Sequence, residues 1–258
     1  MKITTNAARV SVLALAFSAA VPLTFAAVPD DAVRLQIVER LRRAGLDREA
    51  DVRVDVRNGE ARLTGVAVTV HALREVERQA RKVTEPVDNR LRVVPVEPHT
   101  DSEIAAAVTE AILRYPYYTV FDSVEGRVEN GVVSLRGSVL QPYRRTAIEN
   151  RIEKVPGVRG IVNAVAVQPV SIHDSRLRRG LVRAIYDDPR FVQYASWANP
   201  PVRIVVDRGR VTLSGFVATR VEQTVLAHIA RGFPLFGFEN NVRVEGERSE
   251  DTAQEMAF

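Results

Sequence analysis

Cysteine is absent from the 258 residues, and this excludes several classes of protein at once. A disulfide framework and a thiolate metal site both require cysteine. A lipoprotein requires one as its lipid acceptor, so we do not expect a lipid-anchored protein.

Lysine is almost absent as well. Only Lys2, Lys82 and Lys154 stand against 33 arginines. Arginine suits bidentate contacts with phosphate or carboxylate groups, but a bias in genomic base composition explains the same excess. Residues 27–258 hold 34 basic and 32 acidic side chains, so net charge alone does not favour a polyanionic partner.

Long hydrophobic runs are also scarce. The longest is VSVLALAFSAAV (10–21), whose 12 residues are too few to span a bilayer. Lys2 and Arg9 precede it, and the small residues Thr24 and Ala26 follow, which is typical of a signal peptide. We therefore expect residues 1–26 to be removed, with a membrane anchor as the alternative. The mature chain is then expected in an exported compartment, soluble or peripheral on a membrane.

Motifs for catalysis are missing from the sequence. None of the four histidines has the spacing of a metal site, and neither G-x-S-x-G nor a P-loop lysine occurs. These histidines are His71, His99, His173 and His228. The sequence therefore predicts no enzyme, no cofactor, no metal site and no small-molecule substrate.

One pattern occurs three times. The stretches are VRNGEARLTGVA (56–67), VENGVVSLRGSV (128–139) and VDRGRVTLSGFV (206–217). They share V-x-x-G-x-x-x-L-x-G, whose fixed positions are Gly59, Leu63 and Gly65, then Gly131, Leu135 and Gly137, then Gly209, Leu213 and Gly215. Apolar residues alternate on both sides of the first glycine, which predicts a β-hairpin with a type I′ turn rather than a phosphate-binding loop.

A two-residue turn fixes the pairing of the strands. In the second copy it places Val128 opposite Val133 and Gly126 opposite Leu135. Gly137 then lies opposite Val124, where we expect a side chain to crowd the helix packing, at the end of its strand.

Helices are predicted on both sides of each hairpin. The first opens with an aspartate suited to N-capping, at Asp30, Asp101 or Asp174, and continues with an apolar stripe. The second is expected over 70–83, 142–155 or 219–231, and a short strand with asparagine before alternating apolar residues closes each copy.

The chain is thus predicted to be α+β, with three tandem α-β-β-α-β modules. We divide it into a signal peptide (1–26), modules 27–95, 101–171 and 172–245, and a tail (246–258). The tail has little apolar content and is expected to be disordered.

This pattern resembles the BON domain. The opening aspartates, the repeated hairpin, the second helix and the closing segment VPGVRGIVNAVAV (155–167) carry the resemblance. It implies two helices on a small mixed three-stranded sheet in each module, and a non-enzymatic role in the cell envelope. It also implies that this role involves phospholipid membranes, osmotic stress and envelope integrity, or chaperone-like action. The third copy departs from the pattern by an insertion, FVQYASWANPP (191–201).

The third module is the basic one. Residues 172–245 hold 11 basic and 7 acidic side chains, whereas residues 101–171 are neutral. Its first helix carries Arg176, Arg178, Arg179 and Arg183, and we predict that all four point away from the core. Tyr194, Trp197 and Phe236 are the aromatic candidates. Arginine with tyrosine or tryptophan suits an anionic bilayer interface, although a solvated helix face and a Trp197 folded back on its own module are equally compatible.

The predicted function is binding to anionic phospholipid surfaces in support of envelope integrity. Nucleic acid is not an expected partner, because an exported chain is separated from the genome. The alternative is a chaperone-like or scaffold protein that binds unfolded proteins, outer-membrane proteins or cell-wall material. An edge strand of any of the three sheets suits an extended peptide in that case.

Overall fold

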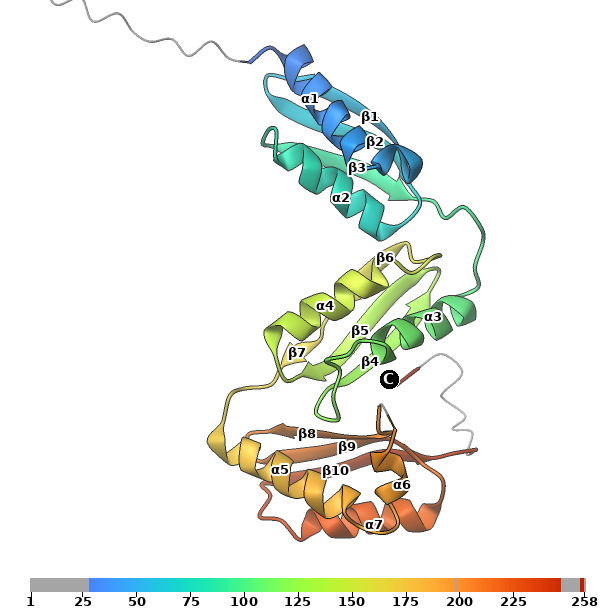
Figure 1. Cartoon of the computed structure of the whole chain (residues 1–258), viewed down its shortest axis with the longest axis vertical. Helices are drawn as coiled ribbons and strands as arrows, with labels where there is room; N and C mark the ends of the chain where they lie inside the picture. The colour runs from blue at the N-terminus through green and yellow to red at the C-terminus, as the bar shows by residue number, and fades with distance from the viewer. Residues whose placement is uncertain (1–27, 198, 247–255, 258) are drawn as a thin grey trace, which may run out of the picture.

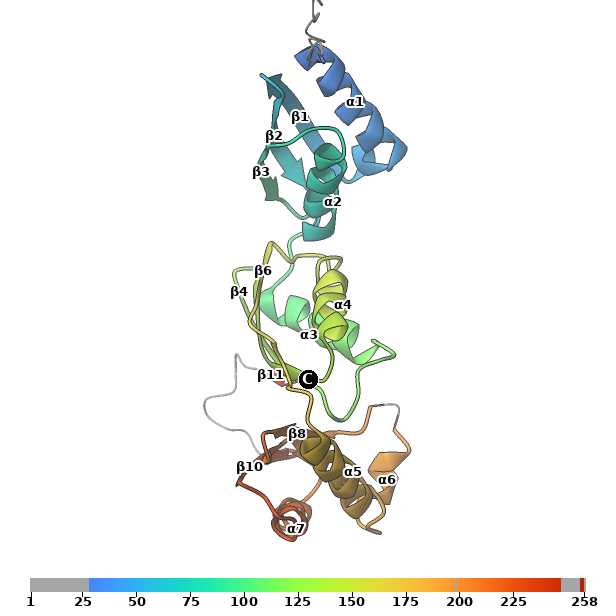
Figure 2. The same ribbon diagram turned by 90° about the vertical axis from the view of Figure 1, so that its left-hand side faces the viewer.

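The computed structural model describes residues 28–197, 199–246 and 256–257. Three modules follow one another along the long axis of the molecule (Figure 1). In the first two modules the helices lie on the same side of the sheet, whereas the third module is turned so that β8 faces the second module (Figure 2). The predicted α+β fold with three repeated helix–sheet units is confirmed.

The first module shows the repeated unit most simply. Its elements are α1 (Asp30–Arg43), the short 3-10 helix η1 (Leu46–Arg48), β1 (Ala50–Arg57), β2 (Glu60–Ala67), α2 (Val70–Arg81) and β3 (Val87–Val93). β1 pairs antiparallel with β2, and β3 pairs parallel with β2, so the sheet is mixed in the order β1-β2-β3.

The second module repeats this order with a divided third strand. Its elements are α3 (Asp101–Leu113), β4 (Ser123–Glu129), β5 (Val132–Val139), α4 (Pro142–Ile152), β6 (Gly160–Asn163) and β7 (Ala166–Val167). A further strand, β11 (Met256–Ala257), pairs antiparallel with β4 at the other edge of the sheet.

The third module adds a short helix to the unit. Its elements are α5 (Ile172–Tyr186), α6 (Val192–Ala195), β8 (Val202–Asp207), β9 (Arg210–Val217), α7 (Arg220–Arg231) and β10 (Gly237–Val244). The helix α6 lies within the insertion 191–201, and its neighbour Phe191 is fully buried in the core of the module.

The hairpin prediction is confirmed in all three copies. The turn residues Asn58, Asn130 and Arg208 have positive φ angles of 52°, 52° and 48°, and a glycine with positive φ follows each, as a type I′ turn requires. The pairs Val128–Val133, Gly126–Leu135 and Val124–Gly137 are as predicted. Leu63, Leu135 and Leu213 are each buried at the centre of a hydrophobic core.

The predicted role of the three aspartates as N-caps is wrong. The N-cap positions belong to Pro29, Thr100 and Ser171, and the last two accept a backbone N–H with their hydroxyl groups. The aspartates lie one to three residues further on and reach across to the hairpin turns instead. Asp30 accepts the N–H groups of Asn58 and Gly59, both at 2.8 Å.

The other two aspartates make the same contact. Asp101 accepts the N–H groups of Asn130 and Gly131 at 2.7 and 2.8 Å. Asp174, which is fully buried, accepts those of Arg208 and Gly209 at 3.0 and 2.8 Å. We call this contact the aspartate clamp. It ties the first helix of each module to the tip of its hairpin.

The reason given for Gly137 also needs correction. A Cβ atom there would lie 2.2 Å from the carbonyl oxygen of Ser123, so the neighbouring strand excludes a side chain, not a helix. Gly65 and Gly215 meet the same obstacle at 2.0 and 1.9 Å. Gly137 does not end its strand either, since β5 continues to Val139.

Both ends of the sequence lie largely outside the described residues. This applies to the predicted signal peptide (1–26) and to most of the predicted disordered tail (246–258), of which Met256 and Ala257 pair with β4. Within the described part of the chain, no helix combines the length and the apolar character that crossing a bilayer demands.

Candidate functional site

The first helix of the third module carries an exposed row of basic residues. Arg176, Arg179 and Arg183 are all exposed. They are spaced i, i+3 and i+7, so they share one face of α5. Ile172, four residues before Arg176, extends the same face and is 75% exposed. We call these four residues the α5 stripe.

Arg178 is not part of this surface, and its predicted exposure is wrong. It retains only 4% exposure, because it lies three residues before Leu181 and seven before Ile185 and therefore points into the module. Its guanidinium donates to the side-chain oxygen of Gln168 at 3.0 Å and to the carbonyl oxygen of Val206 at 2.6 Å. Burial lowers the pKa of this arginine, although Asp174 and Asp207 oppose the shift.

Tyr194 is buried as well, which corrects its predicted place at the surface. It retains 5% exposure and packs in the core of the third module. Its hydroxyl oxygen accepts the N–H of Ala218 at 3.0 Å, and the hydroxyl donates to Glu222 at 2.9 Å. The tyrosine therefore fixes the start of α7 rather than meeting a ligand.

The sequence allows Trp197 either to be exposed or to fold back on its own module, and the structure shows a position between these two. It is 48% exposed, and its ring lies 5.7 Å from that of Tyr194 and 6.3 Å from that of Phe216. Since Phe216 is itself 38% exposed, the two rings form a small aromatic patch at the edge of the module.

Phe236 is exposed, as expected, but it lies at the opposite end of the module. It is 77% exposed and stacks against His173 with ring centroids 5.9 Å apart. Its N–H donates to the carbonyl oxygen of Gly209 in the hairpin turn at 2.9 Å. Phe216 lies in β9 seven positions after Gly209, which corresponds to roughly 20 Å along a strand. Trp197 and Phe236 therefore do not form one surface, and only Phe236 lies beside the start of the α5 stripe.

A joint between the second and third modules contains residues that the sequence patterns do not single out. Arg203 is 3% exposed, lies with its guanidinium 4.6 Å above the ring of Tyr118, and donates to the carbonyl oxygen of Thr119. The N–H of Ile204 donates to the carbonyl oxygen of Val120 at 2.7 Å. Burial raises the pKa of Tyr118 to about 12, so its phenol stays neutral beneath the arginine.

A signal for this joint is present in the sequence all the same. The loop between α3 and β4, RYPYYTVFD (114–122), is rich in aromatic residues, which is unusual for a solvated connection. Val120 and Phe121 from this loop pack against the core of the third module. Ser123 of β4 and Ser214 of β9 also join the two modules, because their hydroxyl groups share a hydrogen bond of 2.9 Å.

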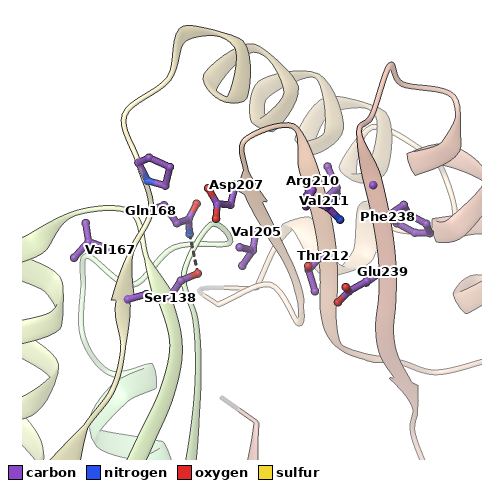
Figure 3. Close-up of a pocket in the computed structure, with 13 residues that line it drawn as sticks. Ser138, Val167, Gln168, Val205, Asp207, Arg210, Val211, Thr212, Phe238 and Glu239 are labelled. Atoms are coloured by element: carbon purple, nitrogen blue, oxygen red, sulfur yellow. Dashed lines mark hydrogen bonds between the residues drawn. The ribbon is translucent and has the colours of Figure 1, made fainter.

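A groove of about 500 Å³ opens beside the joint (Figure 3). Ser138, Val167 and Gln168 line it from the second module, and Val205, Asp207, Arg210, Thr212, Phe238 and Glu239 line it from the third. Gln168 donates to Ser138 at 3.3 Å and to the carbonyl oxygen of Phe121 at 2.6 Å while it accepts from Arg178. The buried Arg178 is thus connected through Gln168 to the second module.

The joint between the first and second modules has a different construction. Arg74 of α2 donates to Glu149 of α4 at 2.7 Å and also to Glu153, which is 4% exposed. The N–H of His71 donates to the carbonyl oxygen of Glu153 at 3.0 Å. Val70, at the start of α2, is buried in the core of the second module. The first turns of α2 therefore dock on the C-terminal end of α4.

Comparison with known proteins identifies the repeated unit. The family model of the BON domain matches residues 29–95, 100–169 and 189–246. The third match begins after α5, although α5 holds the same place in its module as α1 and α3 do in theirs.

The comparison with solved structures gives weaker similarities. One structure of CdsD, a structural protein of the type III secretion system of Chlamydia trachomatis, is 13% identical, with 83% of this chain and 92% of that chain covered at a TM-score of 0.23. A structure of the C-terminal domain of CdsD is 12% identical, with 84% of this chain and 99% of that chain covered at a TM-score of 0.24. No curated protein sequence matches. Because the three family matches cover most of the sequence and each includes the hairpin, the second helix and the closing strand of a module, the protein belongs to the BON domain family and carries three tandem copies of that domain.

Proposed function

We propose that this protein is a periplasmic, non-enzymatic envelope protein whose third module binds anionic phospholipid surfaces and supports envelope integrity under osmotic stress. The BON domain is not a catalytic domain, and BON-domain proteins are typically periplasmic or envelope-associated, so the family fits a non-enzymatic envelope role. The choice of phospholipid and of the third module rests on the chain's own residues.

The α5 stripe is the observation that carries the proposal. Arg176, Arg179 and Arg183 lie on one exposed face, and within the described residues none of them forms an ion pair with a carboxylate. Ile172 and Phe236, 75% and 77% exposed, stand at one end of this face. A row of cations that ends in exposed apolar side chains suits the boundary between phosphate headgroups and acyl chains.

The expected affinity is modest and sensitive to salt. Each basic residue near an anionic surface contributes about 1 kcal/mol, so three arginines contribute ~3 kcal/mol before screening. The Debye length is about 8 Å at physiological ionic strength, and added salt shortens it. Reversible peripheral binding is therefore expected rather than permanent attachment.

Cosedimentation with vesicles tests the proposal. Residues 27–258 should sediment with vesicles that contain phosphatidylglycerol and not with vesicles of phosphatidylcholine alone. The variant Arg176→Glu/Arg179→Glu/Arg183→Glu should lose this binding. The variant Arg40→Glu/Arg42→Glu/Arg43→Glu makes the same charge change on α1, the equivalent helix of the first module, and should retain it. Equal loss in both variants would show that only net charge matters.

Two further measurements show which end of the third module contacts the vesicle. Phe236→Ser should weaken binding several-fold, whereas a blue shift of Trp197 emission on vesicles would place the contact at the opposite end. If neither vesicle binds and the protein instead suppresses the aggregation of an unfolded client, the chaperone-like alternative replaces the membrane proposal.

A further inference from the structure

The first strands of the second and third modules are both met at their outer edges by the loop 114–122. In β4 the N–H of Val124 donates to the hydroxyl oxygen of Tyr118 at 3.1 Å. In β8 the N–H of Ile204 donates to the carbonyl oxygen of Val120 at 2.7 Å. Val124 and Ile204 are both fully buried. One loop thus occupies backbone groups at the edges of two sheets.

β1, the equivalent strand of the first module, lacks this cover. It is connected to α1 by residues 44–49, a shorter segment than 114–122. The two-residue turn after β1 directs the N–H and C=O groups of Val52, Val54 and Val56 away from β2. Within the part of the chain that the structure describes, no strand or loop pairs with these groups. An edge of this kind is a template for another extended chain.

The side chains of β1 that face away from the core alternate in charge. They are Asp51, Arg53, Asp55 and Arg57, and all four are exposed. Asp55 and Arg57 form an ion pair of 3.4 Å whose side chains are 58% and 84% exposed. Exposed ion pairs contribute little to stability, so these charges are available to a partner strand of matching sign.

The strand that matches this pattern is β1 itself. If two antiparallel copies meet about a two-fold axis at Val54, the opposite-charge pairs are Arg53 with Asp55 and Asp51 with Arg57, each formed twice. A shift of the pairing by two residues places Arg53 opposite Arg53, or Asp55 opposite Asp55. Like charges directly opposite each other are destabilising, so the charge pattern selects the register that is centred on Val54.

We propose that the outer edge of β1 is a homodimer interface, at which two copies of this chain pair β1 with β1 in antiparallel orientation about Val54. The outward N–H and C=O groups of both strands then face each other, because Val54 meets Val54 and Val52 meets Val56. The two sheets become one continuous sheet. The first module lies at one end of the molecule (Figure 1), so the contact leaves the α5 stripe of each copy free.

The dimer is expected to be reversible. Each hydrogen-bonded pair in an antiparallel ladder exchanges two bonds, so the three pairs supply about six main-chain hydrogen bonds. An edge contact of this size is smaller than the apolar interfaces of obligate homodimers. The exposed charges act mainly by fixing the register and excluding wrong partners.

Sedimentation velocity of residues 27–258 tests the proposal through charge exchange. The unaltered chain should form a dimer as its concentration rises. Arg53→Asp places an aspartate opposite Asp55, and Asp55→Arg places an arginine opposite Arg53, so each variant alone should be monomeric. An equimolar mixture of the two variants should form a heterodimer, because both central pairs are again opposite in sign.

The mixture also serves as the control for folding. Arg62 lies opposite Asp55 in β2, so Asp55→Arg adds a like charge within the module, but recovery on mixing requires both variants to be folded. Arg92→Asp makes the same charge change as Arg53→Asp in β3, at the other edge of the sheet, and should leave the dimer unchanged. A monomer at every concentration, a dimer that survives Arg53→Asp, or no recovery in the mixture would each overturn the proposal.

The absence of cysteine allows a direct check of the register. Opposite residues in an antiparallel pair have Cα atoms about 4.5–5.5 Å apart, within the range of a disulfide. Arg53→Cys mixed with Asp55→Cys should therefore oxidise to a disulfide-linked dimer. Either variant alone should oxidise far more slowly, since its two cysteines are then diagonal neighbours about 7–8 Å apart. Equal rates in the mixture and in the single variants would exclude this register.

Discussion

At the scale of single residues, the aspartate clamp explains why the repeated motif combines an aspartate with a turn some 30 residues later. A hairpin turn with two residues at positive φ presents two neighbouring N–H groups at its tip, and Asp30, Asp101 and Asp174 each supply a carboxylate that accepts both. Hydrogen bonds to a charged group are stronger than those between neutral groups. The clamp therefore holds the start of the first helix to the tip of the hairpin in each module.

Asp30→Ala is expected to destabilise the first module by about 2–4 kcal/mol, since it removes two hydrogen bonds to a carboxylate. Asp31→Ala, the next residue in the same first turn, should change the unfolding free energy by less than about 0.5 kcal/mol, because its side chain is 88% exposed. Hydrogen exchange of the first module's amides measures both. Similar losses in the two variants would attribute the effect to negative charge at the start of the helix rather than to the clamp.

Glycines at two positions of the motif should respond differently to alanine. A Cβ atom at Gly59 would meet no other atom within 4 Å, so Gly59→Ala adds only the strain of a positive φ angle, about 1–2 kcal/mol. Gly65→Ala also forces Cβ to within 2.0 Å of the carbonyl oxygen of Asp51 and should destabilise the module by at least about 3 kcal/mol. Denaturant unfolding that ranks the two variants in the reverse order would contradict this explanation.

At the scale of elements, the sequence predicts most accurately what depends on neighbouring residues. Hairpin register follows from alternation and turn chemistry within 12 residues, so the predicted positions of Val124, Gly126 and Val128 are correct. The predicted positions of Arg178 and Tyr194 are wrong because their burial depends on partners far along the chain. Arg178 bonds Gln168 and Val206, and an arginine on the core face of α5 has no local signal other than its spacing from Leu181.

The helix contact between the first two modules gives a prediction for Arg74. Removing one partner of a buried ion pair costs about 3–5 kcal/mol, and the 41% exposure of the Arg74 side chain reduces this to about 1–2 kcal/mol. Arg74→Ala should therefore speed exchange of the His71 amide, which bonds Glu153 across the joint, by roughly tenfold. Arg78→Ala, one turn along α2, breaks only a pair within its own helix and should leave this amide protected.

The same contact should weaken in acid. Burial acts to raise the pKa of Glu149, but hydrogen bonds from Asn163 and Arg74 outweigh it and leave the pKa below its usual range. A lowered pKa means that the contribution is complete above the unfolded value of about 4.3 and is lost as pH falls through the folded value. The His71 amide should thus lose protection, corrected for intrinsic exchange, below about pH 4. Protection that is constant down to about pH 3 would exclude this role of Glu149.

At the scale of the whole molecule, two unlike joints connect three like modules. The first joint sets the start of α2 against the end of α4, and the second sets β8 and the core of the third module against the 114–122 loop. Repetition of the fold therefore does not extend to repetition of the contacts between copies. The second module is held on both sides, whereas the first and third each keep one free end.

Arg203→Ala should loosen the second joint. It removes the contact above Tyr118 and the hydrogen bond to Thr119, and it leaves space where the side chain was buried. Small-angle scattering should show a larger radius of gyration, with each module still folded. Arg210 is an exposed arginine in the same sheet, so Arg210→Ala should leave the scattering curve unchanged. An unchanged curve for Arg203→Ala as well would show that the joint depends on the loop alone.

The aspartate clamp has a consequence for the order in which the chain folds. It joins residues only 28–35 positions apart, so each module brings its helix and hairpin together through a short loop closure. During synthesis from the N-terminus, a module can complete this contact before its successor has emerged. β11, whose partner Gly126 lies 130 positions earlier, is then the last strand to join the molecule.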